Sequence, residues 1–153
     1  MTSATPPAAA PLVTPAYMHT MAAYNAAMNR RLYDAAARLS AQDRVKDRGA
    51  FWGSIHRTLA HILWGDQTWM SRFDGWPKPA AAMQDGPDAY PDFAELTRVR
   101  ADADTRIIEW ANRVTPAWLA EDLVWFSGAA QREIRMNKSL LVTHFFNHQT
   151  HHR

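Results

Sequence analysis

The sequence predicts an all-α domain, a four-helix bundle with a short hairpin before the last helix. Four segments carry apolar residues at the three- and four-residue steps of amphipathic helices. Residues that cap helices precede the first, third and fourth of these segments. The chain has 153 residues, 47% of them apolar, with seven tryptophans. This size and composition fit one domain with a single hydrophobic core.

The first predicted helix follows a leader. Met1 to Pro15 is rich in alanine, proline and threonine, so we expect a disordered leader at 1–15 and one domain over 16–153. Thr14 and Pro15 fit the N-cap and the first helical position. The helix is expected to continue to about Ser40. Its apolar stripe comprises Tyr17, Met21, Tyr24, Met28, Leu32 and Leu39.

The second helix is expected between two loops. Asp43 to Gly49 is polar and ends in glycine, which predicts a loop. The helix then extends from Ser54 to just before Gly75. Its apolar face comprises Ile55, Leu59, Ile62 and Trp69. Four prolines and two glycines between Gly75 and Pro91 predict a long connecting loop.

The third helix begins at a capping pair, Asp92 with Glu95. Its predicted buried face comprises Leu96, Ala103, Ile107, Trp110 and Val114. Its predicted solvated face comprises Arg98, Asp102, Arg106 and Arg113. One more helical turn is expected at Thr115-Pro116. Residues 123–136 are predicted to be extended, with a turn at Ser127-Gly128.

Composition excludes several classes of function. The chain has no cysteine, so disulfides, thiolate ligands and cysteine nucleophiles are excluded. The formal charge is only +2 and the basic residues are scattered, which argues against nucleic acid as a partner. No apolar run approaches the roughly 18 residues of a membrane span. A cytoplasmic protein with no membrane partner is the resulting expectation.

The last predicted helix, capped by Asn137 or Ser139, carries the strongest chemical signal. His144, His148 and His152 recur every four residues and therefore share one helix face, whereas His151 points about 100° away from His152. Two imidazoles at this spacing can hold one transition-metal ion. Spacing alone allows either neighbouring pair to do so. A structural role for His144, or a solvated basic end, is the alternative.

Two other residues refine this interpretation. Gln149 stands where the H-E-x-x-H motif has its general-base glutamate, so the chain is not a metalloprotease of that type. His61 lies in the second helix, within TLAHILWGDQTW. A lone histidine in an apolar helix is more often a core residue than a ligand. Facing helices of a bundle would nevertheless bring it to the histidines of the last helix, and three imidazoles leave a coordination position open.

Three stretches carry a resemblance to a known family: YNAAMNRRLYDAA, GAFWGSIHRTLAHILWGDQTWMSRFDG and LLVTHFFNHQTHHR. They resemble the DinB/YfiT-like family of metal-dependent proteins from about Ala16 to Arg153. The resemblance implies an up-down-down-up four-helix bundle, commonly a homodimer. It also implies a divalent metal, usually nickel or zinc with iron or manganese as alternatives, bound by His61, His148 and His152.

The resemblance also implies pocket residues. Tyr24, Asn25 and Asn29 match the first-helix motif and would line the pocket or pack between helices. Asp66 matches an aspartate after the first ligand and would either serve the pocket or pair with an arginine. Family members usually continue past the matching arginine with Gly-Gln and a further turn. The sequence stops at Arg153, so His152 is expected in a last helical turn.

The resemblance implies a class of reaction but does not identify the substrate. Relatives of known activity include transferases and isomerases that use bacillithiol or mycothiol. The resemblance therefore implies a thiol-dependent transferase acting on a small electrophile. The alternatives are a metal-dependent hydrolase and a non-catalytic, stress-associated dimer that binds metal or ligand. The family's damage-inducible name suggests DNA binding, which the scattered basic residues do not support.

Overall fold

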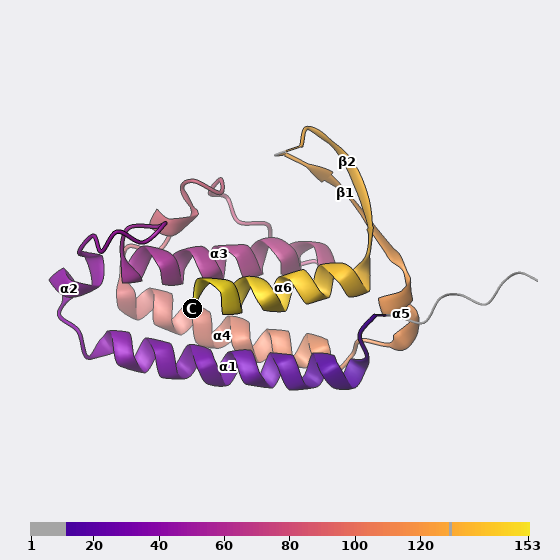
Figure 1. Ribbon diagram of the computed structural model, residues 1–153, viewed down its shortest axis with the longest axis horizontal. Helices are drawn as coiled ribbons and strands as arrows, with labels where there is room; N and C mark the ends of the chain where they lie inside the picture. The colour runs from indigo at the N-terminus through magenta and orange to yellow at the C-terminus, as the bar shows by residue number, and fades with distance from the viewer. Residues whose placement is uncertain (1–11, 129) are drawn as a thin grey trace, which may run out of the picture.

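The computed structural model describes residues 12–128 and 130–153. Four long helices lie side by side: α1 (Pro15–Ala37), α3 (Ile55–Phe73), α4 (Phe93–Ala111) and α6 (Lys138–His152). Figure 1 shows α1 and α6 running in one direction and α3 and α4 in the other. The helices α1 and α3 each contact both α4 and α6. The predicted helical fold is thus confirmed, with a small antiparallel sheet beside it.

Shorter elements connect the long helices. They are α2 (Ala41–Val45), the 3₁₀ helix η1 (Gly86–Asp88), α5 (Pro116–Ala120), β1 (Asp122–Ser127) and β2 (Arg132–Asn137). The expected hairpin is confirmed, since β1 pairs antiparallel with β2 and Trp125 lies opposite Ile134. It projects away from the helices near the start of α6 (Figure 1).

Two loop predictions were wrong in part. The helix α2 takes in the first residues of the loop predicted at 43–49, and η1 interrupts the loop predicted at 75–91. A local cap explains α2: the Ser40 hydroxyl oxygen accepts a hydrogen bond from the backbone N–H of Asp43 at 3.0 Å. A one-turn helix of this kind is too short to show the repeating apolar pattern from which long helices are predicted.

The predicted helix starts are confirmed by their caps. The side-chain oxygens of Thr14, Ser54 and Asp92 each accept a backbone N–H from three residues on, at 3.2, 3.2 and 2.7 Å. Asn137 rather than Ser139 caps α6. The hydroxyl of Ser139 instead donates to the Leu119 carbonyl at 2.7 Å, inside the protein.

The end of α1 differs from the sequence prediction, and part of the expected leader cannot be compared with it. Residues 1–11 of the expected leader lie outside the described residues, and its last residue, Pro15, is the first residue of α1. The helix ends at Ala37, three residues before Ser40.

The buried face of α1 also differs from the predicted stripe. It comprises Met18, Ala22, Asn25, Ala26, Asn29, Tyr33 and Ala36. Tyr24, placed in the apolar stripe by periodicity, is 47% exposed. The reason is that alanines let α1 approach its neighbours closely, while two asparagines are buried with polar partners. The large residues of the predicted stripe therefore flank the contact, while Met18 and Tyr33 are buried in it.

Aromatic side chains form the core toward the α5 end. The rings of Phe73 and Trp110 stack with centroids 5.5 Å apart, and Trp118 and Phe145 pack edge-on against both. The side chains of Val142, Phe145 and Phe146 in α6 are buried in this core. Among the described residues, no helix is both long enough and apolar enough to cross a bilayer.

Candidate metal centre

Three histidines meet between α3 and α6. His61 comes from α3, and His148 and His152 come from successive turns of α6. Their ligand atoms all lie within 4.8 Å of one another. The ring centroids are 5.2 Å apart for His61 and His148, 4.7 Å for His61 and His152, and 4.6 Å for His148 and His152. In the described part of the chain, no other group of three histidine or acidic residues is gathered this closely.

The chemistry of the triad fits a divalent ion. The Nδ1 atoms of His61 and His148 are buried and have no hydrogen-bond partner among the described residues. Burial, reinforced by the neighbouring His152, lowers the pKa of His61 to about 4 and that of His148 to about 3. Burial also lowers the pKa of His152. All three are therefore neutral near pH 7, which is the form that binds metals.

The rings are held in place by residues that sequence patterns did not single out. Trp52 stacks on His61 with ring centroids 4.1 Å apart and an interplanar angle of 30°. On the other side, Gly65 leaves room for His148: a Cβ atom at position 65 would lie 2.8 Å from its Cε1 atom. Trp52 lies in an irregular segment before α3, where no periodicity indicates which way a side chain points.

Replacing Gly65 with alanine should displace the His148 ring and weaken metal binding. The new methyl group is too close to the imidazole, which must rotate away from the shared site. The helix itself should gain stability, because alanine is favoured over glycine in a helix by about 0.8–1.0 kcal/mol. Competition with a coloured chelator would measure zinc affinity, and urea unfolding would measure stability. Unchanged affinity in a folded Gly65→Ala protein would show that His148 does not need this space.

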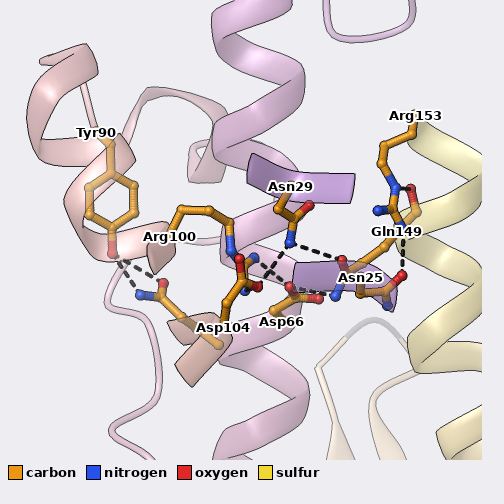
Figure 2. Close-up of polar contacts among 9 residues, drawn as sticks. Asn25, Asn29, Asp66, Tyr90, Arg100, Asp104, Gln149 and Arg153 are labelled. Atoms are coloured by element: carbon orange, nitrogen blue, oxygen red, sulfur yellow. Dashed lines mark hydrogen bonds and ion pairs between the residues drawn. The ribbon is translucent and has the colours of Figure 1, made fainter. Parts of the chain in front are cut away.

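A closed ring of polar side chains joins all four long helices beside the triad (Figure 2). Asp66 Oδ2 lies 2.6 Å from Arg100 Nη1 and accepts from Gln149 Nε2 at 2.9 Å. Arg100 Nη2 lies 2.8 Å from Asp104 Oδ1. Asn29 Nδ2 closes the ring by donating to Asp104 Oδ1 at 2.9 Å and to Gln149 Oε1 at 3.3 Å.

The polar ring fixes α6 relative to α3. Gln149 is adjacent to His148 in α6, and Asp66 lies five residues after His61 in α3, so their hydrogen bond holds the two ligand-bearing helices in register. The ring is shielded from solvent, since Asp66 and Gln149 are fully buried. Burial raises the pKa of Asp66 to about 6, against the opposing effect of the Arg100 guanidinium. The ring therefore depends on its ion pairs remaining complete.

The pocket candidates occupy two different places. Asp66 forms the ion pair with arginine that the sequence left open as an alternative. Tyr24 and Asn25 lie at the end of α6 beside Arg153: the guanidinium donates to Asn25 Oδ1 at 2.5 Å, and its Cζ atom lies 5.8 Å from the Tyr24 ring centroid. A pocket role for Tyr24 and Asn25 stays a prediction.

The remaining C-terminal histidines pack beside the triad but do not belong to it. The exposed His144 places its ring edge-on to Trp69, with centroids 5.4 Å apart. His151 is exposed on another side of α6. Neither belongs to the group that can hold one ion. His152 is the last residue of α6, as the sequence predicted.

Two cavities border the triad on either side of His152. One encloses about 400 Å³ between α1 and the segment around the start of α3. The other encloses about 390 Å³ and is lined by Ala50, Phe51, Trp52, Thr58, His151 and His152. Thr58, Ala50 and His152 line both. Both cavities therefore reach the triad at His152.

A protein-family model matches the chain over most of its length. The model of the DinB family matches residues 12–153, which include the three histidines and the whole polar ring. A search of curated proteins gives no match.

Proposed function

The chain belongs to the DinB family, and we propose that it is a divalent-metal-dependent enzyme that transfers a low-molecular-weight thiol to a small electrophile. The observation that carries the proposal is the triad of neutral imidazoles between α3 and α6. We also propose that the four long helices form the family's up-down-down-up bundle. Their contacts and opposed directions support this arrangement.

A divalent ion held by three neutral imidazoles keeps its positive charge, and when bound it lowers the pKa of a coordinated thiol or water. Nickel or zinc fits best, and iron or manganese is the alternative, since imidazole does not select strongly among transition metals. In the proposed transfer to an alkyl halide, the S–H proton passes to solvent, a carbon–sulfur bond forms and halide leaves. The sulfur comes from a cosubstrate, because the chain has no cysteine.

The protein's own contribution is positioning. Trp52 and the space above Gly65 orient two of the imidazoles, and the polar ring holds their helices together. The two cavities that meet at His152 offer separate places for a thiol and an electrophile. This arrangement favours transfer between two organic molecules over hydrolysis, which needs only one besides water.

Turnover should depend on both a metal and a thiol. The assay loads untagged protein with zinc, nickel or manganese and supplies bacillithiol, mycothiol or glutathione with a panel of epoxides and alkyl halides. We expect thiol consumption above the uncatalysed rate, lost in His148→Ala and retained in His144→Ala. Product formation without any thiol would instead indicate the hydrolase. If metal raises the melting temperature but no combination turns over, a non-catalytic, metal-binding, stress-associated protein is the better description.

We further propose that the protein is a homodimer, as family membership suggests. Large apolar side chains remain exposed on the hairpin and at the start of α6, among them Val124, Phe126, Met136 and Leu140. Such faces are typical of interfaces between copies of one chain. Light scattering at micromolar concentration should give twice the chain mass of 17.4 kDa. A mass equal to a single chain would exclude the dimer.

A further inference from the structure

We infer that the cavity between α1 and α3 binds a small aliphatic carboxylic acid, with its chain between the helices and its carboxylate beside Arg153. The inference rests on the proposed function in one respect: it names the class of electrophile that would reach the metal centre, an apolar molecule bearing a carboxylate. Binding of such an acid does not itself require the metal. The two ideas can therefore fail separately.

The walls of this cavity are aliphatic. From α1 they comprise Leu32, Ala35, Ala36 and Leu39, and from α3 they comprise Ile55 and Leu59. Its volume of about 400 Å³ lies within the roughly 300–1,000 Å³ typical of small-molecule sites. The two alanines leave the width that an alkyl chain needs, and among the described residues the lining contains no phenylalanine, tyrosine or tryptophan. An aliphatic chain of moderate length matches these walls.

The charged side chains that line the cavity are positive. Among the described residues they are Arg48 and Arg153, and no acidic side chain lines the cavity there. Arg48 has a distant partner, with its Nη2 atom 3.8 Å from Asp43 Oδ1. Among the described residues, no aspartate or glutamate side chain lies within ion-pair distance of Arg153. A guanidinium that no side-chain carboxylate neutralises, at one end of an apolar cavity, is suited to a ligand carboxylate.

Arg153 is held in place but not saturated. Its Nε atom donates to the Gln149 carbonyl at 3.2 Å, and Nη2 donates to Asn25 Oδ1. Its Nη1 atom is buried and has no hydrogen-bond partner among the described residues. Part of the guanidinium is thus fixed by protein groups, while one buried donor is left unsatisfied. Holding the group in this way reduces the entropy lost on binding an anion.

The cavity also reaches the candidate metal centre. His152 lines it next to Arg153, so the same end of the cavity carries both the arginine and a ligand of the triad. A cation would be repelled from this end, and a neutral alkane would gain nothing from it. An aliphatic carboxylic acid fits both features, because its alkyl chain can pack against the aliphatic walls and its carboxylate can pair with the arginine.

The test measures binding of three probes to the full chain by isothermal titration calorimetry. Octanoate has both the chain and the charge, octanamide has only the chain, and acetate has only the charge. In metal-free protein prepared with a chelator, octanoate should bind at least tenfold more tightly than either of the others. Equal affinity for octanoate and octanamide would overturn the role of the arginine. Equal affinity for octanoate and acetate would overturn the role of the cavity.

Variants locate the binding. Arg153→Gln should weaken octanoate at least fivefold and leave octanamide unchanged, whereas Arg31→Gln, which removes a charge from an exposed position on α1, should change neither. Ala35→Phe should block octanoate by filling the cavity. If this variant does not fold, Arg153→Gln decides the question. Octanoate that binds only zinc-loaded protein and is insensitive to Arg153→Gln would be a metal ligand, and the inference would be wrong while the metal centre stood.

Discussion

Replacing His61 with alanine should reduce zinc affinity by more than about 100-fold, the upper range for loss of a residue that only supports a metal ligand. His61 is the triad's only contribution from α3, so its loss leaves two histidines on one helix of the site. Its side chain is 4% exposed and stacked under Trp52, and water cannot easily replace it at the same position. A chelator competition titration of purified His61→Ala against wild type would measure the change.

The matched controls for His61→Ala are the same substitutions at His144 and His151. Both residues are exposed and lie outside the triad, so both variants should retain wild-type affinity. His152→Ala should lose affinity as His61→Ala does. If His144→Ala lost the metal while His152→Ala kept it, the ligand pair on α6 would be one helical turn earlier than we describe.

Replacing Asp66 with alanine should destabilise the fold by about 3–5 kcal/mol, as expected when one partner of a buried ion pair is removed. The substitution leaves Arg100, which is 2% exposed, without one of its two carboxylates, and it leaves Gln149 Nε2 without an acceptor. Such a loss is a large part of the total stability of a domain of this size. Urea unfolding of metal-free protein would measure it without a contribution from metal binding.

Asp102→Ala, on the exposed face of α4, provides the control. Asp102 pairs with Arg98 at 3.1 Å, but both side chains are more than 60% exposed. An exposed pair of this kind contributes only about 0–1 kcal/mol. Similar losses in Asp66→Ala and Asp102→Ala would mean that the polar ring does not stabilise the packing of α6 against α3.

Asp102 and Asp104 in α4 show what sequence patterns could not reveal. The motif Arg-x-x-x-Asp occurs twice in α4, as Arg98 with Asp102 and as Arg100 with Asp104. The first pair lies on the surface and the second is buried, although they are only two residues apart. Which pair is buried depends on which face of α4 meets the other helices, and local spacing is the same for both. The first pair was predicted to be solvated, and the second was missed.

Other features could be predicted because their causes are local. The caps at Thr14, Ser54 and Asp92 each act over three residues, and the aliphatic steps of α4 fixed its buried face. The positions of His148 and His152 on one face follow from helix geometry. Joining His61 to them required a tertiary arrangement, which the predicted bundle suggested and the family resemblance made specific.

Predicting the buried face of α1 and the position of Trp52 also required knowledge of the tertiary arrangement. Asn25 and Asn29 are buried because their partners come from other helices. Tyr24 is exposed although its neighbours in the predicted stripe are apolar. Trp52 covers His61 from an irregular segment whose path no repeat defines. In each case a non-local contact, not the residue type, decides the outcome.

The metal content of untagged protein, purified without a nickel column and analysed by elemental mass spectrometry, tests the central claim most directly. We expect about one nickel, zinc, iron or manganese ion per chain, and less than a tenth of that in a variant with His61, His148 and His152 all replaced by alanine. Wild-type protein that remains metal-free after incubation with excess zinc and gel filtration would contradict the claim. So would a triple variant that keeps the same metal content as wild type.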